Sequence, residues 1–88
     1  MANREYVNLG PLIARWRRGA ALSQAALADA LGTQQATVSK LESGRYRLSV
    51  VQLMTILEAC GLSLTDVAGD VERVMKSEGR PLWERIDE

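Results

Sequence analysis

The stretch QAALADALGTQQATVSKLES, residues 24–43, predicts two short helices joined by a glycine turn. Ser23 is the expected N-cap of the first helix, because its side-chain oxygen can accept a hydrogen bond from an otherwise unpaired N–H. Gly32 is expected to end that helix in a left-handed conformation, Thr33 to cap the second helix, and Gly44 to end it. Apolar residues at helical spacing define the buried side of the pair: Leu27, Ala28, Leu31, Val38 and Leu41.

Helical periodicity extends over the rest of the chain and indicates five helices with no convincing strand, so we predict an all-α fold. The fourth helix is framed by a capping-box pair, Ser49 and Gln52, and by Gly61, and the fifth follows Ser63. With 88 residues the chain has room for one domain. The first helix, from about residue 9 to residue 18, carries an apolar stripe: Leu9, Leu12, Ile13 and Trp16.

The composition argues against several classes of protein. No apolar run approaches the roughly 18 residues that cross a membrane, and the N-terminus lacks the apolar segment of a signal peptide, so a cytoplasmic location without membrane partners is expected. Cys60 is the only cysteine and histidine is absent, so we predict neither an internal disulfide nor a zinc site, and no cofactor. No serine, cysteine or carboxylate pair is placed with a base, which predicts that the protein is not an enzyme.

A few residues have both a functional and a structural interpretation. Cys60 lies on an apolar stripe, which favours core packing over redox sensing, and Trp16 is also expected in the core. Asp66, Asp70 and Glu72 suggest a metal site, but they fit a solvated helix face better.

The net charge is zero, yet the charges are divided along the chain. Residues 1–48 carry seven basic and three acidic side chains, whereas residues 49–88 carry four basic and eight acidic ones. Chance on solvated faces would explain the division equally well. It gains weight because the positive half contains the helical pair, so a neutral chain can still present a basic surface to nucleic acid.

The outward side of the helix after Thr33 suits the DNA major groove. At about 100° per residue, Val38 and Leu41 face one way, and short, amide or basic side chains face the other. Glutamine can bond adenine, lysine can reach guanine, serine suits either, and alanine contacts the thymine methyl. The outward residues are Gln35, Ala36, Ser39, Lys40 and Ser43.

Residues around this helix are candidates for contacts with phosphate. Gln24, at the start of the preceding helix, can present its amide or the helix N-terminus to a phosphate. Tyr46, between two arginines, either packs on the sugar-phosphate backbone or covers the helix. The predicted phosphate contacts are Gln24, Ser43, Arg45, Arg47 and Arg18.

Residues 9–67 resemble the Cro/lambda-repressor type of helix-turn-helix domain, a five-helix family of phage repressors and bacterial regulators. The second part of the likeness is the L-x-x-I-L-x-A-C-G-L-S-L pattern of residues 53–64, and Leu48 departs from the family where a proline is frequent. The other residues that carry the resemblance are Gln24, Leu27, Ala28, Leu31, Gly32, Thr33, Val38, Leu41 and Gly44.

The resemblance implies specific roles. The residue like Gln24 braces the one like Gln35, and Arg17 and Glu42 correspond to an ion pair between the first and third helices, which makes Arg17 mainly structural. A homodimer on a pseudo-palindromic operator is also implied, with two recognition helices about 34 Å apart on one face of the duplex. The implied base contacts are Gln35, Ala36, Thr37, Ser39 and Lys40, of which Thr37 rests on the resemblance alone.

We expect an N-terminal arm (residues 1–8), the DNA-binding domain (residues 9–67) and an extension of the fifth helix with a tail (residues 68–88). Leu64 and Val67 are expected to pack on the domain's own core. The apolar residues beyond them lie further out and are predicted to make a dimer contact: Val71, Val74, Met75 and Trp83.

The predicted function is a sequence-specific, double-stranded DNA-binding transcriptional regulator, and a repressor acting by occlusion because no activation surface is visible. An antitoxin that controls its own operon is the nearer alternative, since such antitoxins share the QATVSKLESG type of helix and the acidic tail suits a basic toxin. A module that uses the fold only to bind proteins is the more distant one.

Overall fold

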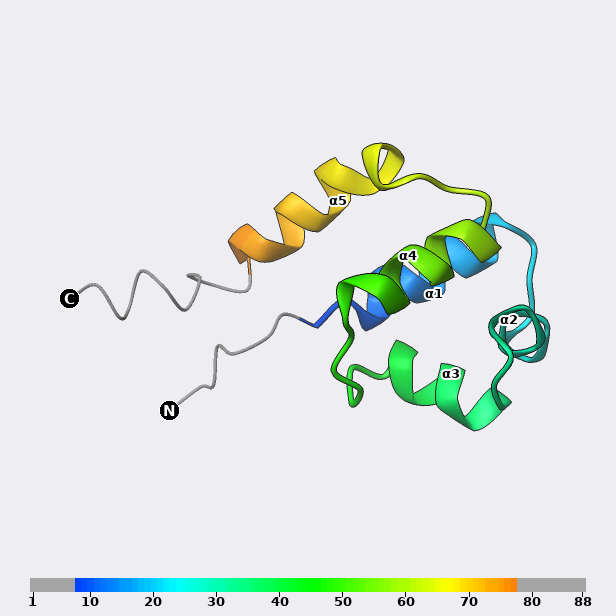
Figure 1. The fold of residues 1–88 in the computed structure, drawn as a ribbon. Helices are drawn as coiled ribbons and strands as arrows, with labels where there is room; N and C mark the ends of the chain where they lie inside the picture. The colour runs from blue at the N-terminus through cyan, green and yellow to red at the C-terminus, as the bar shows by residue number, and fades with distance from the viewer. Residues whose placement is uncertain (1–7, 78–88) are drawn as a thin grey trace.

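The computed structural model describes residues 8–77, which form five helices and no strand. In order these are α1 (Gly10–Gly19), α2 (Gln24–Leu31), α3 (Gln35–Glu42), α4 (Val50–Ala59) and α5 (Leu64–Ser77), so the predicted all-α fold is confirmed. α2 packs on α3 and α4, and α3 also packs on α1. α5 crosses the opposite side of α4 from α3 (Figure 1). None of the described helices is long and apolar enough to cross a bilayer.

The helix ends follow the predicted signals in most cases. The Ser23 hydroxyl accepts a hydrogen bond from the Ala26 N–H at 3.0 Å, and Gly32 ends α2 with φ of 72°. At the start of α4, Ser49 and Gln52 form both bonds of the capping box, at 3.1 and 2.9 Å. These caps fix where α2 and α4 begin, and the left-handed Gly32 fixes where α2 ends and the turn before α3 starts.

The prediction that Thr33 caps α3 is wrong. The cap position is Gln34, which makes no side-chain cap bond. The Thr33 N–H donates to the carbonyl of Ala28 at 2.9 Å, so Thr33 still belongs to the turn that closes α2. Its hydroxyl bonds the Thr37 hydroxyl at 3.1 Å instead of a backbone N–H. The chain therefore turns over one residue more than predicted, and α3 is preceded by Gln34 at the cap position.

All five helices contribute to one hydrophobic core. Trp16 and Cys60 are both buried in it, as predicted, and burial raises the pKa of the Cys60 thiol, so the side chain behaves as an apolar group. The side chains with almost no exposed surface are Ile13, Leu27, Val38, Ile56, Leu57 and Val67. The core thus joins the α2–α3 pair to the other three helices.

The structure corrects two expectations for α5. Val67 is buried as predicted, but Leu64 is 45% exposed and does not join the core. Val71 and Val74, which we expected further out, are partly buried and pack against the core, and Met75 is 37% exposed. The stripe therefore faces inward one turn later than predicted. Trp83 lies outside the described residues, as do residues 1–7 of the predicted arm.

Asp70 holds α5 against α1, so placing it on a solvated face was wrong. Its carboxylate, 22% exposed, pairs with Arg15 at 2.9 Å and with Arg73 at 2.6 Å, and accepts a bond from the Trp16 indole at 3.5 Å. The hydrogen bond from Arg15 is the main reason that the pKa of Asp70 lies below its usual value. Asp66 caps α5 by accepting from the Ser63 N–H at 2.9 Å. No metal-binding cluster forms within residues 8–77.

Asp70→Asn is expected to loosen the docking of α5, because it removes the charge that joins Arg15, Arg73 and Trp16. Amide hydrogen exchange should accelerate in α5 and change little in α2 and α3. Glu72→Gln, at an exposed acidic residue two positions on, is the matched control and should leave the exchange of α5 unchanged. Equal exchange in the two variants would contradict the role assigned to Asp70.

Candidate nucleic-acid interface

Helix α3 presents an outward face of short and amide side chains. Val38 and Leu41 turn inward, 0% and 5% exposed, and anchor the helix in the core. Most of the predicted base-contacting residues lie on the exposed side. With no long acidic side chain outward, this face can lie close to another surface. The predicted base-contacting residues on this exposed side are Gln35, Ala36, Ser39 and Lys40.

Thr37 differs from the other predicted base-contacting residues. It is partly buried, its hydroxyl bonds that of Thr33, and its side chain lines a cavity between α3 and α4. The structure therefore places Thr37 at the margin of the outward face. Its inclusion rested on the family resemblance alone, and its partly buried position agrees with the helical periodicity, which did not place it on the outward face.

A chain of hydrogen bonds runs from α1 to the start of α3. Arg17 contacts Glu42 through Nε at 2.5 Å and through a second nitrogen at 3.2 Å. The Gln24 amide donates to Glu42 at 3.0 Å, and its oxygen accepts from the Gln35 amide at 3.4 Å. The structure thus brings together the ion pair and the glutamine brace that the resemblance implied. Because Gln24 is itself held by Glu42, its hydrogen bond with the Gln35 amide orients the Gln35 side chain.

The Arg17–Glu42 pair is buried, with side chains 11% and 8% exposed. Burial acts to raise the pKa of Glu42, but hydrogen bonds from Arg17 and Gln24 and the charges of Arg17 and Arg18 hold it below the usual value. The hydrogen bond to Glu42 raises the pKa of Arg17, whose guanidinium also donates to the Leu22 carbonyl at 2.8 Å. Both groups are charged at neutral pH, and each depends on the other in the interior.

The first turn of α1 lies directly against the end of α3. A Cβ added at Gly10 would lie 2.8 Å from the carbonyl carbon of Glu42 and 2.9 Å from the Gly44 nitrogen. Asn8 caps this approach by accepting a bond from the Gly10 N–H at 2.9 Å. We did not single out Asn8 or Gly10 from the sequence. Nothing in the local sequence pattern indicates this contact, because it joins two segments that lie more than 30 residues apart.

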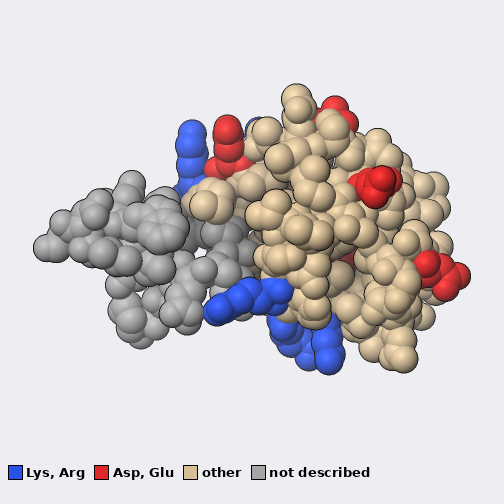
Figure 2. Space-filling view, viewed as in Figure 1, with Lys and Arg blue, Asp and Glu red and all other residues tan. Residues whose placement is uncertain are grey.

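The loop after α3 carries cations next to the outward face. Gly44 adopts φ of 80°, and the Arg45 N–H then returns to the Lys40 carbonyl at 3.1 Å. Ser43 donates to that carbonyl and accepts from Arg45 Nε, both at 2.9 Å, so it orients Arg45. Arg45, Arg47 and Lys40 are exposed. Figure 2 shows basic side chains along the edge where Figure 1 places this loop.

Arg18, the remaining predicted phosphate contact, is exposed on α1. Its charge contributes to the low pKa of Glu42, which places it within electrostatic range of the end of α3. Gln24 is partly buried, and both ends of its amide are used within the protein. Two roles were predicted for Gln24, a phosphate contact and a brace on Gln35, and its side-chain hydrogen bonds correspond to the brace.

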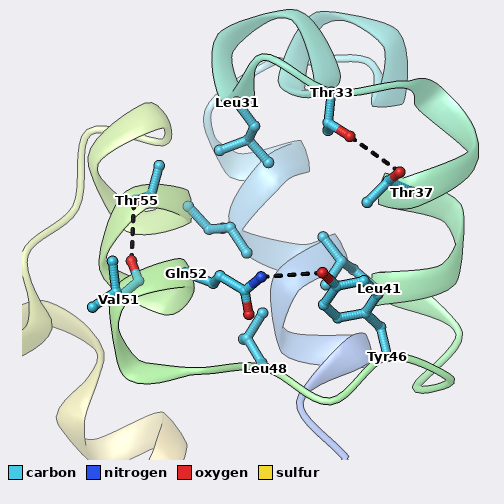
Figure 3. A pocket seen from close by; sticks show the side chains of 10 residues that line it. Leu31, Thr33, Thr37, Leu41, Tyr46, Leu48, Val51, Gln52 and Thr55 are labelled. Atoms are coloured by element: carbon cyan, nitrogen blue, oxygen red, sulfur yellow. Dashed lines mark hydrogen bonds between the residues drawn. The ribbon is translucent and has the colours of Figure 1, made fainter.

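Tyr46 packs against the core, which matches the interpretation that it covers the helix. Its hydroxyl accepts a bond from the Gln52 amide at 3.1 Å, which links the loop to α4. Figure 3 shows this bond across a cavity of about 290 Å³ between α4 and the α2–α3 pair. Leu48, where the family often has proline, is partly buried beside it. Packing by Tyr46 and Leu48 therefore shapes the loop.

Known proteins share this architecture. A family model described as a helix-turn-helix domain matches residues 8–75. The clp gene regulator ClgR from C. glutamicum is 28% identical, with a TM-score of 0.68 over 77% of this chain and 87% of that one. Among curated proteins none matches the sequence.

Two further structures define the extent of the likeness. The restriction-modification controller protein C.AhdI from Aeromonas hydrophila has the same fold, with 24% identity and a TM-score of 0.62 over 69% of this chain and 92% of C.AhdI. Apo-HppE is 30% identical with a TM-score of 0.61 over 68% of this chain, but the match covers 35% of HppE. The chain belongs to the helix-turn-helix domain family of Cro/lambda-repressor type, a family of DNA-binding transcriptional regulators.

Proposed function

We propose that the protein is a homodimeric repressor that inserts α3 into the major groove of a specific, pseudo-palindromic operator. The observation that carries this proposal is the outward face of α3, held by the hydrogen-bonded chain of Arg17, Glu42, Gln24 and Gln35. A side chain fixed in direction discriminates between bases better than a mobile one, because less conformational freedom is lost on binding.

The chemistry of the face supports contacts with base edges. The Gln35 amide can donate to and accept from adenine, and the Lys40 ammonium can donate to the acceptors of guanine. Ser39 is short, and Ala36 adds a methyl group that suits thymine. Arg45 and Arg47 flank this face and would neutralise phosphates, which positions the protein without specifying sequence.

Repression needs only that the operator be occupied, so it follows from binding without a further surface. The antitoxin alternative drew on the shared type of third helix and on the acidic tail of the chain. Four of its acidic residues fall within residues 78–88, outside the described range. The outward face of α3 would bind DNA under either function. We propose repression first because it needs only this face, whereas the antitoxin function also needs a surface for a toxin.

The test compares two basic residues on an operator selected from random duplexes. Lys40→Ala is expected to relax the preference at one base pair per half-site by about 1–3 kcal/mol. Arg45→Ala should weaken all sequences alike and reduce the dependence of log K on log salt by about one per half-site. Equilibrium binding in graded salt against the selected and scrambled duplexes measures both.

Lys76→Ala is the matched control, since Lys76 is an exposed cation on α5. It should alter neither the base preference nor the salt dependence. Affinity that does not fall as salt rises would contradict the proposed function, because neutralised phosphates release counterions.

A further inference from the structure

Gln52, in the first turn of α4, uses both ends of its side-chain amide within the protein. The amide oxygen accepts from the Ser49 N–H at 2.9 Å, and the amide nitrogen donates to the Tyr46 hydroxyl at 3.1 Å. The backbone N–H of Gln52 donates to the Ser49 hydroxyl at 3.1 Å, which completes the capping box. The cap therefore holds the Gln52 side chain towards the segment that precedes α4 (Figure 3).

The segment that receives the bond from Gln52 joins α3 to α4, and we call it the arginine loop (residues 43–49). Burial alternates along part of this loop. Tyr46 and Leu48 are partly buried and pack against the core. Arg45 and Arg47, on either side of Tyr46, are exposed. Where successive side chains point to opposite sides, the direction of one sets the direction of its neighbours, so the position of Tyr46 decides where the two arginines point.

Two kinds of contact hold Tyr46, and they differ in what they fix. Packing of the ring against the core keeps Tyr46 on the domain but has no preferred direction. A hydrogen bond requires a set distance and angle, so the bond from Gln52 fixes the hydroxyl end of the ring. Because the cap of α4 holds Gln52 in turn, this bond joins the arginine loop to α4 in one orientation.

We infer that Gln52 is a positioning residue for DNA binding, which orders the arginine loop through Tyr46 and so raises the affinity for every duplex without selecting bases. This inference rests on the proposed function, in which Arg45 and Arg47 neutralise phosphates. A loop that is ordered before binding loses less conformational freedom when it meets DNA. Phosphate contacts carry no sequence information, so the gain in affinity is the same for all sequences.

Gln52 and Gln24 support different parts of the interface. Gln24 is held by Glu42 and bonds the Gln35 amide, on the outward face of α3. Gln52 is held by the cap of α4 and bonds Tyr46 in the arginine loop. A change at Gln52 is therefore expected to alter the affinity for DNA and to leave the base preference as it is.

The test uses two variants, each with a matched control. Tyr46→Phe removes the oxygen that accepts the bond and keeps the ring that packs on the core. Its control is Thr55→Val, which removes a hydroxyl from the same cavity, where that hydroxyl donates to the Val51 carbonyl within α4. Gln52→Ala removes the donor together with one bond of the capping box. Its control is Ser49→Ala, which removes the other capping bond and leaves both partners of the bond to the loop in place.

Equilibrium binding in graded salt, to the selected operator and to scrambled duplexes, measures the effect on DNA binding. Tyr46→Phe and Gln52→Ala are each expected to weaken binding to all duplexes by about two- to tenfold per half-site, because a neutral hydrogen bond contributes that much. The slope of log K against log salt should stay unchanged, since both arginines remain, whereas Arg45→Ala lowers it. The double variant should lose no more than Gln52→Ala alone, since both changes remove the same bond. The two controls should bind as the wild type does.

Backbone nitrogen relaxation, measured by NMR without DNA, tests the arginine loop itself. The order parameters of residues 45–48 should fall in Tyr46→Phe and Gln52→Ala and stay at the wild-type values in the two controls. Unchanged affinity in both variants, a loss that differs between selected and scrambled duplexes, or a loss of affinity without a loss of loop order overturns the inference. A wild-type protein that binds no duplex contradicts the proposed function instead, and the relaxation data then decide alone whether Gln52 orders the loop.

Discussion

Glu42→Gln is expected to lower the free energy of unfolding by about 3 kcal/mol, because it leaves the Arg17 guanidinium buried without a counter-charge. For a domain of this size the midpoint of thermal unfolding should fall by roughly 12–24 °C. Gln24 also loses an ionised acceptor, so the brace on Gln35 should weaken. Thermal unfolding at neutral pH measures the loss. Glu58→Gln, at an exposed glutamate on α4, should change the midpoint little.

The stability lost in Glu42→Gln is also expected to depend on pH. The pKa of Glu42 is lower in the folded protein than in the unfolded chain, so its contribution is fully present above the unfolded pKa. It is lost as the pH falls through the lower, folded pKa. The gap in stability between wild type and Glu42→Gln should therefore be largest near neutral pH and narrow in acid. A gap that stays constant from neutral to acid pH would contradict the assignment of Glu42 as an ionised partner.

Helix existence was predictable because each signal is local. Ser23, Gly32 and the Ser49–Gln52 box act within four residues of where they stand, and apolar spacing decides which side is buried. The prediction for Thr33 was wrong because two local signals compete at this residue, the turn that ends α2 and the cap that starts α3. Its N–H was already bonded to the previous helix, and the sequence does not display that competition between two turns.

Contacts between helices were harder to predict than the helices. The Arg17–Glu42 pair came from family resemblance, since nothing in the spacing of two residues 25 positions apart indicates that they meet. Asp70 looked like a solvated carboxylate because its partners, Arg15 and Trp16, lie 54 or more residues away. Val71 and Val74 were placed outside the core for a related reason. The tilt of α5 decides which turn of its stripe reaches the core.

Gly10→Ala is expected to destabilise the fold by about 3 kcal/mol, although alanine normally favours a helix. The added methyl group would meet backbone atoms of Glu42 and Gly44, which cannot rotate away as a side chain can. α1 and the end of α3 must then separate, which also strains the Arg17–Glu42 pair. Gly19→Ala is the matched control at the other end of α1, where an added Cβ has no neighbour within 4 Å. That variant should be as stable as the wild type or up to about 1 kcal/mol more stable. If chemical denaturation finds the two variants equally stable, the close approach of Gly10 to the end of α3 does not constrain how α1 and α3 pack.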